Sequence, residues 1–362
     1  MIQIEIGIEI DIIIIEAVHF DFDSNIKINL QPFWPLIQYA TCDHPAFSGS
    51  AYCAGIADGV ESFRYNNRFD GKGIPMTVPL VSVHGGHSGG FCSHARDTLE
   101  AIVQAYVDQG FAWVGITEHM PPVHERYFYD EERRAGFDLD QFRDRFDAYM
   151  AEARRLQAHY KDRLEILVGF ETEAYAGSFE YILQLVDQYQ PDYIVGGVHH
   201  VAEISFDGGP ADYRQAMDAA GGLSDLYCRY FDLQYALIQQ VCPSVVAHFD
   251  LIRIFDPRYE EHLRLPEVRD RIVRNLERIH ELDLILDYNV AALRKGAREP
   301  YVSRWILNQA KNIGIAVVPG DDAHSVDTAG AHVADGIAIL QEMGFDTHWP
   351  KPRPCRPNMV KG

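Results

Sequence analysis

The sequence predicts an α/β fold in which parallel strands alternate with helices and close into a barrel. From Leu80 onwards, short apolar runs alternate with amphipathic segments seven times in one continuous series. Side chains able to bind metal or phosphate follow every one of the seven runs. An open sheet would concentrate such groups at one switch point, whereas a barrel draws them from the carboxyl ends of many strands. The distribution therefore favours a barrel over an open sheet.

The predicted strands are short apolar runs, and the predicted helices are the amphipathic segments between them. The strands cover residues 80–83, 112–117, 164–170, 193–198, 245–247, 284–288 and 316–319. The helices cover residues 98–109, 139–160, 179–189, 225–241, 267–282, 301–312 and 333–343. Asp97 with Glu100 resembles a capping box, and Gly110 follows a helix end. Pro266 and Pro300 occupy predicted first helical turns, where proline is tolerated.

The first 75 residues differ in character from the rest of the chain. Residues 1–16 alternate isoleucine with glutamate and aspartate, and a mixture without durable periodicity follows. The alternation permits a β-strand, but no partner strand or turn signal follows closely. We predict that residues 1–75 are disordered, or result from an upstream start codon with Met76 as the true start; a weak appended element is the alternative. The predicted domains are this extension, a barrel over 76–355 and a tail over 356–362.

Composition narrows the classes of partner. A hydrophobic content of 47% and a charged content of 23% are typical of a globular protein with a sizeable core. The net charge of −21 argues against nucleic acid as a partner, since binding phosphate backbones needs a basic face. The six cysteines form no CxxC pair and are typical of reduced thiols in a cytoplasmic protein. The longest aliphatic run of the N-terminal segment, residues 12–15, is too short to span a membrane. Oligomeric state is left open.

The groups after the predicted strands are mainly imidazoles and carboxylates. In chain order they are His84, His87 and His94; Glu118 and His119; Glu171 and Glu173; His199 and His200; His248 and Asp250; Asn289 and Arg294; and Asp321, Asp322 and His324. An isolated histidine is usually a surface or core residue, but chance would not concentrate histidines at strand ends. This mixture suits zinc, manganese or iron and is too rich in nitrogen for magnesium or calcium alone. One ion cannot accept so many ligands, so two or three divalent metal ions are expected.

Several of these residues lie in segments that together resemble the PHP superfamily, named for polymerase and histidinol phosphatase. The segments are His84-Gly-Gly-His-Ser-Gly, Ile116-Thr-Glu-His119, Gly169-Phe-Glu171, Gly196-Gly-Val-His199, Ala247-His-Phe-Asp-Leu251 and Gly320-Asp-Asp-Ala-His324. Asp250-Leu-Ile-Arg253 and Asp287-Tyr-Asn-Val-Ala-Ala-Leu-Arg294 make the histidinol-phosphate phosphatases the most similar branch. The resemblance implies a distorted (β/α)7 barrel like a TIM barrel, a trinuclear metal centre, and hydrolysis of L-histidinol phosphate to L-histidinol and phosphate.

The resemblance also implies roles for individual residues. The implied metal ligands are His84, His87, His94, His119, Glu171, His199, His248, Asp322 and His324, with Glu171 as the bridging carboxylate. Arg253 and Arg294 match phosphate-binding positions, and guanidinium groups fit phosphate oxygens bidentately. The predicted catalytic set is Glu118, His119, Glu171 and Asp250. Glu118, Asp250 and His200 are unranked candidates for protonating the leaving alkoxide.

The spacing of the first two histidines departs from the family pattern. The superfamily usually opens with His-x-His, whose side chains share a strand face. Here Gly85 and Gly86 separate His84 from His87, which would place the two imidazoles on opposite faces of a regular strand. A bulge at the glycines is expected to restore their convergence.

Two other functions are compatible with the same residues. The first is a different PHP activity, on phosphotyrosine, on nucleotides or as an exonuclease, although the acidic charge disfavours the exonuclease. The second is a metal-binding module without catalysis. The loop carboxylates Glu173, Asp207 and Asp212 could meet the ammonium or imidazole of the substrate, but a solvated role is expected for each.

Overall fold

The computed structural model describes residues 2–8, 11–21, 25–28 and 78–354. The chain divides into two compact units, Met1–Thr77 and Val78–Gly362. In the first unit, β1 (Ile2–Ile8), β2 (Asp11–Asp21) and β3 (Asn25–Ile28) form an antiparallel sheet in that order. The isoleucine alternation thus lies in paired strands. We predicted disorder or an upstream start codon for residues 1–75, and most of these residues lie outside the described ranges. The predicted tail over 356–362 lies outside them as well.

The second unit is built on short parallel strands. They are β4 (Val81–Ser82), β5 (Trp113–Ile116), β6 (Glu165–Val168), β7 (Glu171–Thr172), β8 (Val195–Gly196), β11 (Val245–Val246), β12 (Ile285–Asn289) and β13 (Ala316–Gly320). All ladders between them are parallel. β6 lies within the predicted strand over 164–170, and β7 follows directly after that range. β6 pairs with β5, and β7 pairs with β8. Every predicted strand is therefore confirmed in type and position.

Backbone hydrogen bonds close these strands into a barrel. Val83 N donates to Pro319 O (2.8 Å), which joins β4 to β13, the two ends of the chain of strands. Gly169, between β6 and β7, donates its N–H to Ile116 O (2.8 Å) of β5, so pairing with β5 continues past the end of β6. The result is a seven-stranded parallel barrel, and the fold class predicted from the sequence is confirmed.

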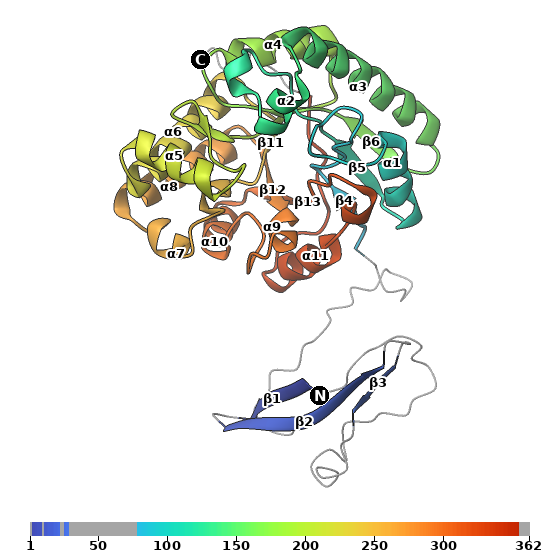
Figure 1. Ribbon diagram of the computed structural model, residues 1–362, viewed down its shortest axis with the longest axis vertical. Helices are drawn as coiled ribbons and strands as arrows, with labels where there is room; N and C mark the ends of the chain where they lie inside the picture. Colours follow the sequence, from blue (N-terminus) through green and yellow to red (C-terminus); the bar gives the residue numbers. More distant parts are fainter. Residues whose placement is uncertain (1, 9–10, 22–24, 29–77, 355–362) are drawn as a thin grey trace. The chain divides into compact units, whose positions relative to one another are not determined.

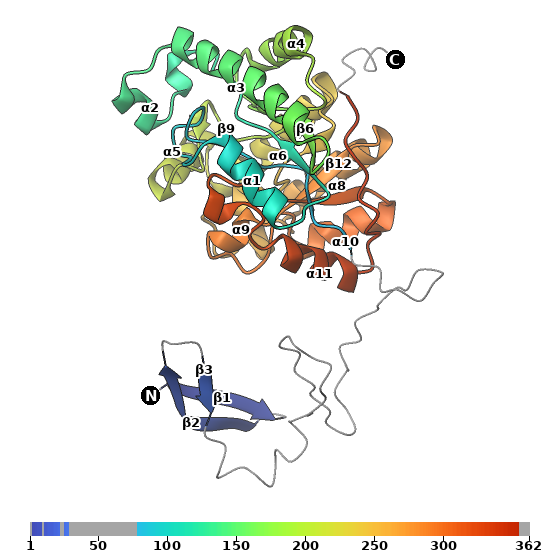
Figure 2. The same cartoon turned by 90° about the vertical axis from the view of Figure 1, so that its right-hand side faces the viewer.

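Helices surround the barrel on all sides (Figure 1). The predicted ones are α1 (Leu99–Asp108), α3 (Leu139–Tyr160), α4 (Ser178–Tyr189), α6 (Leu223–Gln240), α8 (Pro266–Glu281), α10 (Arg304–Ile313) and α11 (Val333–Glu342). Elements that were not predicted are α2 (Asp130–Ala135), α5 (Pro210–Ala220), α7 (Tyr259–His262), α9 (Ala291–Arg294), the hairpin β9 (His200–Val201) with β10 (Ile204–Ser205), and the 3-10 turns η2 (Glu125–Tyr127), η3 (Leu251–Arg253) and η4 (Val326–Thr328). In Figure 2, α2 and α5 lie toward the same end of the barrel.

Two predicted helix signals are wrong. Thr98, not Asp97, caps α1: its side chain accepts from Ala101 N (3.2 Å), whereas the Asp97 carboxylate accepts from Val326 N (2.8 Å) in another loop. Pro300 precedes α10 without entering it, because Ser303 is the N-cap. Pro266 does begin α8.

The core fills the space between strands and helices with large side chains, several of which also satisfy the barrel backbone. Tyr149 is buried and its hydroxyl donates to Gly169 O (2.6 Å). Tyr193 is buried and its hydroxyl donates to Val83 O (2.6 Å). These bonds hold the strand ends from which the polar side chains project. Within the described part of the chain, no helix combines the length and apolarity that a membrane span requires.

Candidate metal centre

Glu171 lies at the centre of the polar side chains gathered at one end of the barrel. It is in β7, and its carboxylate is buried. Oε1 lies 2.9 Å from His248 Nε2 and 3.3 Å from His199 Nε2. Oε2 lies 3.1 Å from His119 Nδ1 and 3.4 Å from His84 Nε2. The two oxygens thus face two different pairs of imidazoles, which is the arrangement that a carboxylate bridging two ions requires.

His84 and His87 converge despite the two glycines between them. His87 Nε2 lies 3.3 Å from Asp322 Oδ1, and His84 Nε2 lies 4.0 Å from the same oxygen. Gly86 has a φ of +79°, in the left-handed region that glycine tolerates best. A side chain on Gly85 would approach the Asp321 carboxylate to 2.4 Å. The glycines thus allow a sharp turn packed against the neighbouring strand end. The predicted convergence of the two histidines is present, but it comes from this turn after β4, which ends at Ser82, and not from the predicted bulge within a strand.

Carboxylates contact several of the imidazoles at the ring nitrogen that faces away from the centre. Asp287 Oδ2 lies 3.0 Å from His84 Nδ1, and Glu118 Oε1 lies 3.3 Å from His87 Nδ1. Glu173 Oε1 lies 2.9 Å from His199 Nδ1, and its Oε2 lies 3.2 Å from His200 Nδ1. For His84, His87 and His199, the carboxylate fixes the ring and leaves the other nitrogen aimed at the centre, as outer-shell partners of metal-binding histidines do.

Two of these supporting residues were missed from the sequence. Glu173 is only 5% exposed, so the solvated role expected for it is wrong. Asp287 was recognised only as part of a motif. Its sequence signal was a carboxylate inside a strand that is otherwise apolar, because a charge is buried only where a partner stabilises it. Asp321, a candidate at the end of β13, instead accepts from Ser82 Oγ (2.6 Å) and Tyr106 Oη (2.8 Å), away from the imidazoles.

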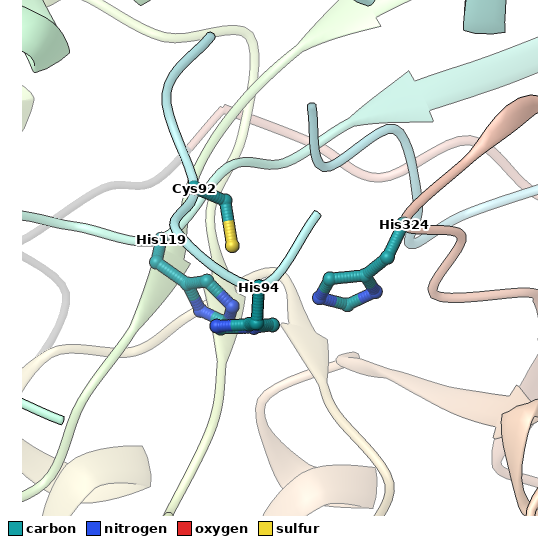
Figure 3. A group of neighbouring side chains, drawn as sticks. All are labelled: Cys92, His94, His119 and His324. Atoms are coloured by element: carbon teal, nitrogen blue, oxygen red, sulfur yellow. The ribbon is translucent and has the colours of Figure 1, made fainter. Parts of the chain in front are cut away.

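A second group of potential ligands lies beside the first. Cys92, His94, His119 and His324 place one sulfur and three ring nitrogens within 4.8 Å of one another (Figure 3). The rings of His87 and His324 stack at a centroid distance of 4.3 Å, which connects this group to the first. Burial raises the pKa of the Cys92 thiol, and the adjacent His119 acts in the opposite direction.

The electrostatics of the buried cluster depend on mutual compensation. Burial opposes ionisation of Glu171, but the surrounding imidazoles, His84 and His199 first, outweigh it and hold its pKa well below the ordinary value. Burial opposes a charge on His84, but Glu171 and Asp287 outweigh it and hold its pKa well above the ordinary value. Protons and cations therefore compete for these nitrogens.

The donor set fits divalent metal ions. The Nε2 atoms of His84, His87, His119 and His324 are buried and have no hydrogen-bond partner among the described residues. A buried polar atom without a partner is costly, and a cation between the rings would remove that cost. Three further groups of possible ligands overlap through shared residues: His84, Glu171 and His248; His84, His87 and Asp322; and His87, His119 and Glu171.

A cavity of about 370 Å³ opens over the cluster. Its walls include Glu171, His119, His199, His248, Asp322 and His324, together with His94, Tyr129, Glu131, Asp207, Gly208, Leu251, Arg294, Lys295 and Tyr301. Arg294 Nη1 and Nη2 donate to Asp321 O (2.5 Å) and Asp322 O (2.9 Å), so its guanidinium is fixed in the wall. Asp207, for which a solvated loop role was expected, lies in the wall as well.

Three predicted site residues are not in the wall of this cavity. Arg253 is 4% exposed and donates to Asp250 Oδ2 (3.1 Å), Glu299 O (3.0 Å) and Pro300 O (2.7 Å). Asp250 also accepts from Ser303 N (2.9 Å). Glu118 supports His87 and accepts from Ser88 N (3.1 Å).

Their contacts bear on the roles expected from the sequence. Glu118 accepts from Ser88 N and, like His200, lines a second cavity, whereas Asp250 accepts from Ser303 N through Oδ2 and its Oδ1 has no hydrogen-bond partner among the described residues. The catalytic roles expected of Glu118 and Asp250 stay predictions. Phosphate contact by Arg253 stays a prediction; in this structure its guanidinium joins η3 to the loop before α10. His200 lines a smaller adjoining cavity of about 50 Å³ that shares His94, His119 and Tyr129 with the larger one.

The sequence matches the PHP domain family over residues 85–291. The chain belongs to the PHP domain family. A relative from Schizosaccharomyces pombe named "Probable histidinol-phosphatase" is 35% identical over 269 residues, which cover 73% of this chain and 87% of the relative. A "Histidinol-phosphatase" from Saccharomyces cerevisiae is 28% identical over 281 residues, covering 68% of this chain and 84% of the relative.

A solved structure of a PHP-type barrel has the same fold. The histidinol phosphate phosphatase from Lactococcus lactis, crystallised with zinc, L-histidinol and phosphate, superposes with a TM-score of 0.56 at 20% identity. The similarity covers 75% of this chain and 95% of that one. The resemblance to the PHP family inferred from short motifs is confirmed by the family match over residues 85–291 and by the Schizosaccharomyces pombe relative.

Proposed function

We propose that this PHP-family chain is a metal-dependent phosphomonoesterase that hydrolyses L-histidinol phosphate to L-histidinol and phosphate. The observation that carries the proposal is Glu171, buried beneath a cavity with two imidazoles against each carboxylate oxygen. The choice of substrate is supported by the two yeast relatives, which are named for that activity. L-histidinol phosphate is a small phosphomonoester, and its size is in keeping with a cavity of about 370 Å³.

We propose two or three divalent ions, of zinc, manganese or iron, held by the nine ligands inferred from the family resemblance. Bound there, the ions would supply a nucleophile from water at neutral pH and neutralise charge on phosphoryl oxygens. Glu171 would bridge two of the positions, and Asp287, Glu118 and Glu173 would keep the imidazole rings aimed at them. The zinc present in the Lactococcus lactis structure supports this metal for the family.

The cavity wall offers separate groups for the two ends of the substrate. Arg294 is fixed there by two backbone carbonyls, and its remaining N–H donors can bind phosphate oxygens. Glu131 and Asp207 add carboxylates to the wall, which suits the ammonium and imidazole groups of histidinol phosphate. Charge complementarity at both ends favours this substrate over an ester with an anionic leaving group.

A substrate panel tests the proposal. Phosphate release is compared for L-histidinol phosphate, phosphotyrosine and a nucleoside monophosphate, with nucleotide release from a single-stranded oligonucleotide as a fourth assay. We expect the highest kcat/KM for histidinol phosphate, loss of activity on chelation, and recovery with zinc or manganese. Higher kcat/KM on another ester would support a different PHP activity, and no turnover at full metal loading would support a binding module.

A matched pair of variants tests the central carboxylate. Glu171→Gln removes the charge that faces four imidazoles, so we expect kcat to fall by at least about 100-fold, more than a supporting residue costs. Glu165→Gln is the control, because Glu165 lies in the adjoining strand and its exposed carboxylate pairs with Lys351. Equal activity of the two variants would contradict the bridging role of Glu171.

We also propose a barrel domain over 76–355 and a cytoplasmic location. The division of the chain after Thr77 supports the first of these. Cys92 and Cys228 are free and buried, which supports a reducing compartment.

A further inference from the structure

Cys92 lies beside the metal centre, where the sequence led us to expect only a structural thiol. It is 5% exposed, and its sulfur belongs to the group of four ligand atoms that all lie within 4.8 Å of one another. Figure 3 shows the sulfur directed toward the rings of His119 and His94, while His324 approaches from the loop after β13. The cysteine therefore belongs to a cluster of potential ligands that comes from three separate loops.

Backbone hydrogen bonds place this cluster before any ion binds. Cys92 N donates to Ser88 O (2.8 Å), which folds the loop after β4 into a tight turn. Arg96 N donates to His324 O (2.8 Å), and His87 N donates to Ala323 O (2.9 Å). The loop that carries Cys92 and His94 is thus joined at both ends to the loop that carries His324. Such preorganisation lowers the cost of gathering ligands.

The spacing suits one tetrahedral ion. Bonds of about 2.3 Å from zinc to sulfur and about 2.0 Å to imidazole nitrogen put neighbouring ligand atoms about 3.3–3.6 Å apart. Small side-chain rotations bring atoms that already lie within 4.8 Å into that range. The Nε2 atoms of both His119 and His324 are buried and lack a hydrogen-bond partner among residues 78–354. They are therefore free to bind the ion.

We propose that Cys92 supplies a thiolate ligand to the third metal ion of the centre, completing a site of one cysteine and three histidines with His94, His119 and His324. The assignment rests on the proposed function, since it refines the same centre. At the other metal positions the ligands besides imidazole are the carboxylate oxygens of Glu171 and Asp322. At the position beside Cys92 the ligand besides imidazole is a sulfur. Thiolate ligands favour zinc, and carboxylates suit manganese. The positions of the centre therefore differ in metal preference, with zinc preferred at Cys92.

Cobalt substitution tests the assignment directly. Cobalt(II) bound to thiolate shows a sulfur-to-metal charge-transfer band in the near ultraviolet, which nitrogen and oxygen ligands do not produce. We expect the band in the cobalt-loaded wild-type chain and its loss in Cys92→Ser. Cys228→Ser is the matched control, because Cys228 is a buried free cysteine in α6 that joins no group of potential metal ligands among the described residues. It should keep the band.

Metal content gives a second, independent measurement. In competition between zinc and manganese, the wild-type chain should retain one zinc per chain that Cys92→Ser and Cys92→Ala lose. A cobalt-loaded wild-type chain without the band, or a band that persists in folded Cys92→Ser, would overturn the assignment. This spectroscopic test does not depend on catalysis. Hydrolysis of histidinol phosphate without the charge-transfer band refutes only the role of Cys92. The band without hydrolysis refutes only the proposed function.

Discussion

At the scale of single residues, the centre depends on carboxylates that do not face the cavity. Asp287 is fully buried and contacts three groups: His84 Nδ1 (3.0 Å), Asn289 Nδ2 (3.0 Å) and His248 N (3.3 Å). Its negative charge fixes the protonated nitrogen of His84 on the side away from the centre. The unprotonated nitrogen is then available to a cation.

Replacing Asp287 should weaken metal binding without removing a proposed ligand. Asp287→Asn abolishes the charge behind His84, and we expect zinc affinity to fall about 10–100-fold, as for other outer-shell partners. Competition with a chelating dye measures this. Asp283→Asn is the control, because Asp283 precedes the same strand but is exposed and pairs with Arg353. Equal zinc affinities for the two variants would show that Asp287 does not support the ligand.

At the scale of elements, the turn after β4 determines whether the first two histidines meet. Gly86 has a φ of +79°, and a side chain there would approach Ile116 Cδ1 to 2.5 Å. Gly110 has a φ of +74°, but nothing lies within 4 Å of the position that its side chain would take. The two glycines therefore share a backbone conformation and differ in packing.

Gly86→Ala should cost more than Gly110→Ala and should alone disturb the centre. Left-handed backbone costs a residue with a side chain about 1–2 kcal/mol, so both variants should lose about that much unfolding free energy. Gly86→Ala should lose more, and its zinc affinity should fall because His87 follows directly. Urea unfolding and zinc titration measure the two effects. Unchanged zinc affinity in Gly86→Ala would show that the turn does not position His87.

Glu132 in α2 introduces a pH dependence of stability. Burial raises its pKa to about 7, and its carboxylate accepts from Tyr129 N (2.8 Å) in a capping box. Because the folded-state pKa lies above the unfolded value, the folded chain holds more protons between the two pKa values. The stability that this provides is present below pH 4.5 and is lost as the pH rises to about 7.

Glu132→Gln should remove that dependence. One pKa unit corresponds to about 1.4 kcal/mol, so the rise from 4.5 to about 7 makes the ionised carboxylate cost on the order of 3–4 kcal/mol above pH 7. We expect the variant to lose less unfolding free energy than the wild-type chain between pH 5 and pH 8, as measured by urea unfolding. Asp130→Asn, at an exposed position of the same helix, should follow the wild-type chain. A parallel loss in Glu132→Gln would contradict the effect of burial.

At the scale of the whole molecule, the barrel contains its own core. In the part of the chain that the structure describes, the core cluster runs from Val81 to Trp349 and lies within the second compact unit. Trp349 Nε1 donates to Pro79 O (3.0 Å), which ties the last described segment to the start of β4. A unit with a continuous core of this kind is expected to fold by itself.

A chain that begins at Val78 should therefore keep its activity. We expect kcat/KM for histidinol phosphate within about twofold of the full-length chain, and the same thermal midpoint for the barrel. A chain that begins at Ala112 is the control; it lacks β4 and α1, so the barrel cannot close and the protein should be insoluble. Loss of activity in the chain from Val78 would show that the first unit contributes to function.

Local pattern alone was enough to predict the strands, most helices and the kinds of side chain that gather at the centre. Apolar periodicity reports which residues face a core, and the position of His119, Glu171 or His248 after an apolar run reports the end of the barrel at which it lies. Short elements such as α2 and α9 escaped prediction because their patterns are too brief to show a period.

Only the tertiary structure decided which side chains meet. His84 and Asp322 are far apart in the chain and come together because β13 pairs with β4 when the barrel closes. The same closure buries Glu173, places Asp287 behind His84, and sets Arg253 against backbone carbonyls outside the cavity wall. It also brings the Cys92 thiol next to three imidazoles, a position that the sequence did not indicate. Sequence pattern specifies the face and end on which a residue lies, whereas contacts depend on the pairing and stagger of strands around the closed barrel.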